Sequence, residues 1–173
     1  MKKVFLVFFL AVASLASYAK PDFEIPEPKA YDSAEECRKD NDIALKVAKF
    51  YLDAKLPDDV VWAKDAASFL LTWITASGDI TLVISDKRCE FLKCKDKNIG
   101  SLVLMAYMSG CVVYCLENKQ HDHDFNMHYF ALTKMMEYYE KNREITGSDK
   151  EMDKLLANFK KKSFKEKEEK KFK

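Results

Sequence analysis

No proline occurs between Pro57 and the last residue, Lys173, and the whole chain contains only four glycines. Folds made of short β-strands need turn residues about every 8–12 positions, and proline and glycine supply most of them. Their scarcity excludes a β-sandwich of this length. Three of the four glycines instead separate segments whose apolar residues recur at the helical period. We therefore predict an all-α fold, a single domain of about five antiparallel helices arranged as a bundle or an αα-hairpin array.

The first nineteen residues have the layout of a secretory signal peptide. Residues 2–3 are lysines, residues 4–10 are apolar, and the small residues Ser17 and Ala19 precede the expected cleavage site. The apolar stretch and the residues up to the cleavage site are too few for a membrane-spanning helix, which needs about 18 or more residues. We therefore expect cleavage after Ala19 and export of the mature chain, periplasmic or secreted.

The remaining chain falls into three parts of different composition. Residues 20–32 hold three of the four prolines and form an extended lead-in, residues 33–160 form the helical domain, and residues 161–173 form a charged tail. From position 160 onward, eight lysines stand against three glutamates, a net charge of +5. The preceding body, 20–159, has 19 basic and 25 acidic side chains, a net charge of −6.

This distribution of charge bears on the partners of the protein. An acidic body offers no broad positive face for a phosphate backbone, which excludes nucleic acid as the main partner. The glutamates dilute the positive charge of the tail, so we favour a solvated extension that buries little apolar surface. Attraction of the tail to anionic components of the cell envelope stays open as a second interpretation.

Start and stop signals place the first two helices of the domain. Ser33 followed by Glu36 fits a capping box, and the helix that it starts is expected to reach Leu56, before Pro57. A second helix is expected over 59–77, with apolar residues on much of its circumference.

Weaker signals follow the second helix. Residues 80–85, ITLVIS, are the one strand-like run of the body, and a short helix is expected over 86–95. Later in the chain, Asp124 is placed to start a long helix, and Gly147 separates that helix from the last one.

Residues 102–116 are the most apolar segment of the mature chain. Fifteen residues are too few to cross the hydrocarbon core of a bilayer, so we predict a buried central helix and no transmembrane segment in the mature chain. Ala106 and Gly110 lie four positions apart on this helix. They form a face of small residues that another helix can approach closely.

All three histidines of the chain lie close together, and with one acid they are the candidate metal ligands: His121, His123, Asp124 and His128. Imidazole and carboxylate groups bind zinc, copper and nickel. Asp124 and His128 are one turn apart if the helix has begun, whereas the other two histidines would have to fold back from a loop. No outer partners that would orient these ligands are evident, so we favour a polar loop with Asp124 as a helix cap.

Five cysteines in an exported chain raise the question of disulfide bonds. None of the spacings is a CxxC motif. Cys111 and Cys115 are four apart on the central helix, where their Cβ vectors are roughly parallel and unsuited to a bridge. Cys37, Cys89 and Cys94 are freer to pair, and the odd total leaves at least one free thiol or an intermolecular bond.

No catalytic motif stands out in the sequence. There is no GxSxG, SxxK or HExxH pattern and no phosphate-binding glycine loop. The aromatic residues of the body occur at helical spacing and are better explained as core. We therefore assign no catalytic residue and no cofactor.

Three segments besides the signal peptide carry a likeness to other proteins: FLLTWITASGDIT at 69–81, LVLMAYMSGCVVYCLEN at 102–118 and FALTKMMEYYEKN at 130–142. With them the chain resembles a loosely defined group of exported all-helical bacterial proteins of unknown function. These are packing patterns, so the resemblance implies a fold and transfers no catalytic residue. We expect a non-enzymatic periplasmic binding or interaction module for a protein, peptide or cell-envelope component. A small metal-dependent enzyme using residues 121–128 is the alternative.

Overall fold

The computed structural model describes residues 21–173, so the predicted signal peptide and its cleavage site lie outside the described residues. Within these residues the fold is all-helical and contains no strand, as predicted. It has seven α-helices rather than about five, and five of the seven are at least ten residues long. The elements are α1 Ala34–Arg38, α2 Asn41–Asp53, α3 Val60–Ala76, the 3₁₀ helix η1 Glu90–Lys93, α4 Lys97–Asn118, α5 Phe125–Thr146, α6 Lys150–Phe159, α7 Phe164–Glu169 and the 3₁₀ helix η2 Lys170–Phe172.

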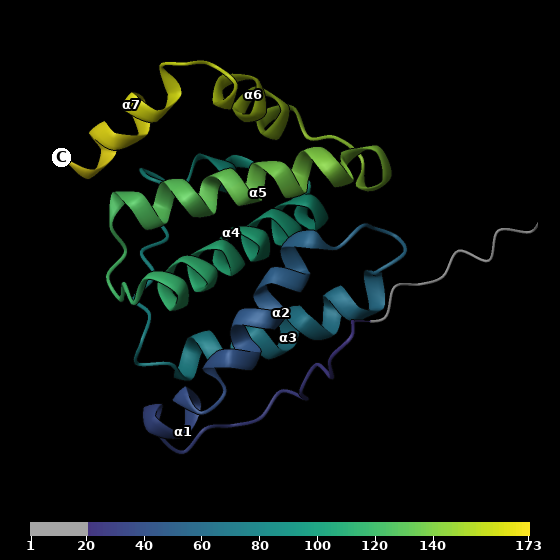
Figure 1. The fold of residues 1–173 in the computed structure, drawn as a ribbon. Helices are drawn as coiled ribbons and strands as arrows, with labels where there is room; N and C mark the ends of the chain where they lie inside the picture. Colours follow the sequence, from purple (N-terminus) through teal and green to yellow (C-terminus); the bar gives the residue numbers. More distant parts are fainter. Residues whose placement is uncertain (1–20) are drawn as a thin grey trace, which may run out of the picture.

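The helices lie in successive layers (Figure 1). At one side α2 and α3 lie together, α4 and α5 follow, and α6 and α7 cover the outer face of α5. The layers place α4 at the centre, where it packs against α2 on one side and α5 on the other. Its buried face extends from Ile99 to Cys115.

The close approach of α4 and α5 depends on a glycine, as the small face on the central helix predicted. A Cβ atom added at Gly110 would lie 2.7 Å from the Cα atom of Ala131 on α5. Real Cβ atoms do not come that near to a backbone atom, so only glycine permits this separation of the two helices. The helix itself is 22 residues long, longer than the apolar run within it.

By length and composition α4 is, of the described helices, the one that could cross a membrane. In this fold 67% of its most apolar window is buried inside the protein. Helix α4 is therefore the central helix of the protein core, because α2 and α5 cover its apolar side chains.

The first predicted helix is interrupted. Ser33 caps α1 as expected, since its Oγ atom accepts a hydrogen bond from the Glu36 amide at 3.2 Å. The helix then stops at a turn and restarts as α2, with Asp40 at the boundary. The Asp40 carboxylate binds the Nζ atom of Lys29 and the hydroxyl of Tyr31, both at 2.9 Å. The break between α1 and α2 therefore lies at the residue that holds the lead-in segment on the body, Asp40.

The strand-like run at 80–85 forms neither a strand nor a helix. Its backbone lies along the loop before α5, where the Thr81 amide donates to the His121 carbonyl and the Val83 amide donates to the His123 side chain. One of these two bonds goes to a side chain, so no ladder forms. The helix expected over 86–95 is reduced to the four residues of η1.

The C-terminal tail is not a solvated extension. Helix α7 and η2 fold back over α5 (Figure 1), and Phe164 and Glu168 are only 5% and 2% exposed. The Phe172 ring packs with its centroid 5.0 Å from that of the His128 imidazole. The expectation of a tail that buries little surface is therefore wrong, because one face of this lysine-rich segment carries two aromatic rings and a buried acid.

Candidate functional site

The four candidate metal ligands, His121, His123, Asp124 and His128, do not converge on one point. His121 directs its Nδ1 atom at the Asp79 carbonyl oxygen, 2.6 Å away. Asp124 caps α5, and its Oδ1 atom accepts a hydrogen bond from the Met127 amide at 2.8 Å. Throughout residues 21–173 no group of three or more His, Cys, Asp or Glu side chains is placed to hold a metal ion.

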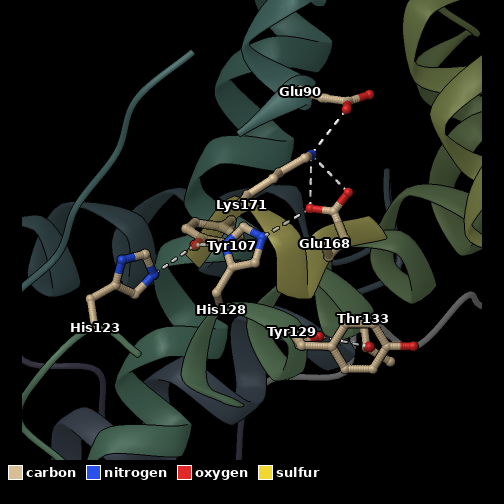
Figure 2. Close-up of polar contacts among 8 residues, drawn as sticks. All are labelled: Glu90, Tyr107, His123, His128, Tyr129, Thr133, Glu168 and Lys171. Atoms are coloured by element: carbon tan, nitrogen blue, oxygen red, sulfur yellow. Dashed lines mark hydrogen bonds and ion pairs between the residues drawn. The ribbon is translucent and has the colours of Figure 1, made fainter. Parts of the chain in front are cut away.

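The other two histidines meet at a tyrosine in the core. The Tyr107 hydroxyl on α4 lies 2.8 Å from the Nε2 atom of His123 and 2.7 Å from the Nδ1 atom of His128. On its far side, the His128 Nε2 atom lies 3.3 Å from a carboxylate oxygen of Glu168 on α7. Figure 2 shows these side chains in one connected line.

The line ends at an ion-pair cluster near the surface. The Lys171 ammonium group on η2 donates to both carboxylate oxygens of Glu168, at 2.7 and 2.9 Å, and to Glu90 on η1 at 2.9 Å (Figure 2). Tyr107 and His128 are fully buried and Glu168 is nearly so. We call the six side chains the histidine–tyrosine network: Glu90, Tyr107, His123, His128, Glu168 and Lys171.

The hydrogen bonds assign the protons along this network. The Val83 amide donates to His123 Nδ1 at 3.3 Å, so that atom is the acceptor and the His123 proton is on Nε2, where it points to the Tyr107 oxygen. Tyr107 then donates to His128 Nδ1, and His128 donates from Nε2 to the Glu168 carboxylate. Two neutral histidines and an anionic glutamate thus use every donor in the line.

Burial and neighbouring charges support this protonation state. The pKa of His123 is lowered to about 4, mainly by burial and also by the positive charge of Arg88, while Asp124 opposes them. Burial acts to raise the pKa of Glu168, but hydrogen bonds from His128 and Lys171 outweigh it, and the net pKa lies below its ordinary value. Burial strongly raises the pKa of Tyr107, which stays a neutral hydroxyl.

The histidines are closed off from solvent by the end of the chain. The Phe172 ring covers His128 and also lies against His123, with ring centroids 6.1 Å apart. The Arg88 guanidinium group in turn lies 4.2 Å from the centre of the Phe172 ring. The cavity beside Glu168 and Lys171 holds about 130 Å³, below the roughly 300–1,000 Å³ of ligand pockets. The network therefore joins four segments, and the cavity at its Lys171 end is smaller than an ordinary ligand pocket.

A second feature lies on the opposite side of α4. A groove of about 480 Å³ opens between α3 and α4, with α2 and the residues after it at one end. Its walls are almost entirely apolar, and Lys64 is the charged side chain among them. The lining residues are Tyr51, Leu56, Val60, Ala63, Lys64, Ala67, Leu71, Ser101, Leu102, Leu104, Met105 and Met108.

Two exposed apolar side chains mark the groove. Val60 and Leu71 on α3 are 51% and 47% exposed, although both are large and apolar. A larger hollow of about 940 Å³ lies between the lead-in and α3, next to Trp62 and Asp65. One of its walls is irregular backbone with several acids, whereas helices build the groove between α3 and α4. The helical groove is the better-formed binding surface.

The five cysteines are free thiols in this structure. Burial raises the pKa of Cys37 and of Cys94 to about 11, and it raises that of Cys89 as well. Thiols with raised pKa values are poor nucleophiles at neutral pH. None of these cysteines adds a nucleophile to either feature.

The sequence alone missed the acid end of the histidine–tyrosine network. Tyr107 stands in a segment read as apolar core, and Glu168 and Lys171 stand in a segment read as solvated. A signal was present, because Phe164, Glu168 and Phe172 are spaced four apart and share one helical face. An acid between two aromatic residues on one face indicates a buried partner for that acid.

No protein-family model, curated protein or solved structure matches this chain. It is an all-helical protein with a closed polar network and an open apolar groove.

Proposed function

We propose that the mature chain is an exported, non-enzymatic binding module and that the groove between α3 and α4 receives an amphipathic helix of a protein or peptide partner. The observation that carries the proposal is the groove itself, which has a volume of about 480 Å³ and exposed apolar walls. In this proposal the five longer helices, α2 to α6, form an antiparallel bundle that carries the groove. Export follows from the signal-peptide pattern of residues 1–19.

The spacing of the groove residues supports a helical ligand. On α3 the lining positions Val60, Lys64, Ala67 and Leu71 recur every three or four residues, along three turns or about 16 Å. Lining positions from Ser101 to Met108 recur in the same way on α4. Two such stripes side by side match the apolar face of an amphipathic helix, whose anchors fall at i, i+4 and i+7.

The charge of the groove supports an acidic partner. Lys64 is exposed on the groove wall, and it forms no ion pair with any residue of the described chain. An acidic side chain on the partner, next to its apolar anchors, would pair with this ammonium group. Such a pair contributes more to the choice and orientation of the partner than to affinity.

The alternative, a metal-dependent enzyme using residues 121–128, has less support. A catalytic metal needs free donor atoms and an open coordination position. In this fold both ring nitrogens of His123 and of His128 are engaged in hydrogen bonds, and the Phe172 ring covers them. These ring nitrogens therefore hold neighbouring segments together by hydrogen bonds and are not free to bind a metal ion.

The proposal is tested with a fluorescent three-turn peptide that carries leucines at i, i+4 and i+7 and a glutamate beside them. Leu71→Glu places a charge in the groove and should weaken binding at least tenfold. Ile145→Glu is the matched control, since Ile145 is 59% exposed on α5 away from the groove. Fluorescence anisotropy measures both variants.

A charge exchange tests the predicted pairing. Lys64→Glu should weaken the acidic peptide and strengthen a version with lysine in place of glutamate. Equal affinities of the wild-type protein and Leu71→Glu would reject the groove as the binding site, and so would no binding of either peptide by the wild type.

A further inference from the structure

The end of the chain is held on the body by groups that can change charge. Residues 164–172 contact α5 through Glu168, which binds His128, and through Phe172, which covers the same imidazole. Lys171 ties Glu168 to Glu90 on η1. Besides the rings of Phe164 and Phe172 and a contact of the Lys165 ammonium group with the Tyr129 ring, this attachment consists of the Glu168 carboxylate, the Lys171 ammonium group and the His128 imidazole.

We propose that residues 164–172 form a clasp that is docked on α5 at neutral pH and detaches in acid. The clasp is a regulatory device that is independent of the groove. It lies on the opposite side of α4, and it requires no ligand.

The groups around the two histidines come from every element that packs there. Helix α4 contributes Tyr107, a neutral donor and acceptor, and the loop before α5 contributes Asp124. The loop before η1 contributes Arg88, whose positive charge opposes protonation of His123. The clasp contributes Glu168 and Lys171, an anion and a cation that pair with each other, and η1 contributes Glu90, the second anion bound to Lys171.

A proton on His123 does not fit the docked arrangement. The ring would then carry N–H groups on both nitrogens, and its Nδ1 atom would face the Val83 amide, which is also a donor. One of the two hydrogen bonds that join the 80–85 segment to the loop before α5 would be lost, and the one from Thr81 to His121 would remain. The same step places a second cation near Arg88, inside a site closed by Phe172.

Linkage sets the direction of the effect. In the docked state the pKa of His123 is about 4. Once Phe172 leaves the imidazole ring, this pKa returns toward its ordinary value of about 6.5. The detached state therefore binds the extra proton between these values. Each pH unit of acidification in this range favours detachment up to about tenfold. Protonation of Glu168, whose pKa is lowered in the docked state, adds to the effect at lower pH.

The test is a measurement of backbone mobility on the mature protein. The heteronuclear ¹H–¹⁵N NOE reports motion on the picosecond to nanosecond timescale for each amide. At pH 7 residues 164–172 should be as rigid as α5. As the pH falls toward 4.5 their NOE values should drop, while those of α4 and α5 stay unchanged.

Paired variants separate the clasp from general acid unfolding. Glu168→Gln keeps the size of the side chain but removes its charge, so residues 164–172 should be mobile already at pH 7. Glu166→Gln is the control, because Glu166 is exposed on the same helix. His123→Gln retains an N–H donor toward Tyr107 and cannot take up the proton, so its detachment midpoint should lie at least one pH unit lower.

Three results would overturn the proposal. The first is a clasp that stays rigid until α4 and α5 themselves unfold. The second is equal rigidity of Glu168→Gln and Glu166→Gln at pH 7. The third is an unchanged midpoint in His123→Gln; if far-UV circular dichroism shows that this variant does not fold, the wild-type profile and the glutamate pair decide the question.

Discussion

The carboxylate of Asp149 accepts hydrogen bonds from the backbone of two chain segments. Its Oδ1 atom accepts hydrogen bonds from the amides of Glu151 and Met152 and so caps α6. Its Oδ2 atom accepts from the amides of Lys95 and Asp96, which precede α4. Burial acts to raise the pKa of Asp149, but the four backbone donors outweigh it and lower the pKa below its ordinary value.

We predict that Asp149→Asn lowers the free energy of unfolding at pH 7 by about 2 kcal/mol. An amide keeps one acceptor oxygen and turns an N–H group toward two backbone donors, which costs charge-assisted hydrogen bonds. Because the folded pKa is depressed, this stability is present above a pH of about 4 and is lost as the pH falls through the folded pKa.

Urea unfolding at pH 7 and at pH 3 checks the prediction, and the gap between wild type and variant should narrow at pH 3. Asp86→Asn, at an exposed loop residue, serves as the control. A variant as stable as wild type at pH 7 would show that the backbone donors do not depend on the charge.

At the scale of helices, the contact between α4 and α5 sets the geometry of the histidine–tyrosine network. Tyr107 and Gly110 lie on adjacent turns of α4, and His128 and Ala131 lie on adjacent turns of α5. The close approach at the glycine therefore brings the tyrosine hydroxyl within 2.7 Å of the imidazole. A wider separation would break that hydrogen bond and leave buried polar atoms without partners.

We predict that Gly110→Ala destabilises the protein by about 1–3 kcal/mol, because the added methyl group collides with the Ala131 backbone. Alanine has the higher helix propensity, which by itself would favour the variant by about 1 kcal/mol. The destabilisation by the steric clash therefore has to be larger than the stabilisation by the higher helix propensity of alanine.

Gly100→Ala on the same helix separates the two contributions. A Cβ atom there would lie 3.8 Å from the Cys94 side chain, an ordinary contact, so this variant should be as stable as wild type or more stable. Thermal unfolding followed by circular dichroism measures both. Equal effects of the two substitutions would contradict a close contact at Gly110.

For the whole molecule, the fold redistributes the charge of the tail. Glu168 is turned inward with its carboxylate on Lys171, while most of the other lysines of the tail remain exposed. Folding thus withdraws one acid and one base from the surface. The basic tail lies against an acidic body, which its net charge of +5 against −6 favours.

We predict that the protein recovered from the periplasm of a bacterial host has lost residues 1–19. The basic start, the short apolar run and the small residues before position 20 are what signal peptidases require. Intact-mass spectrometry of the purified protein measures the loss directly. A full-length species retained in the inner membrane would contradict both cleavage and release.

Local chemistry in the sequence determined the class of fold and several helix boundaries. Scarce proline and glycine predicted the all-helical architecture, Ser33 and Asp124 were recognised as caps, and Gly110 was recognised as part of a small face. Caps and helical spacing act over three or four residues, so they are legible in one segment read by itself.

Tertiary structure alone decided the features whose partners lie far apart in the chain. His128 and Glu168 are 40 positions apart, and Val83 and His123 are also 40 apart. Whether a lysine-rich segment is solvated, or an ITLVIS run pairs as a strand, depends on what the rest of the fold places beside it. The free energy of burying a charge is set by that distant partner, which no local pattern contains.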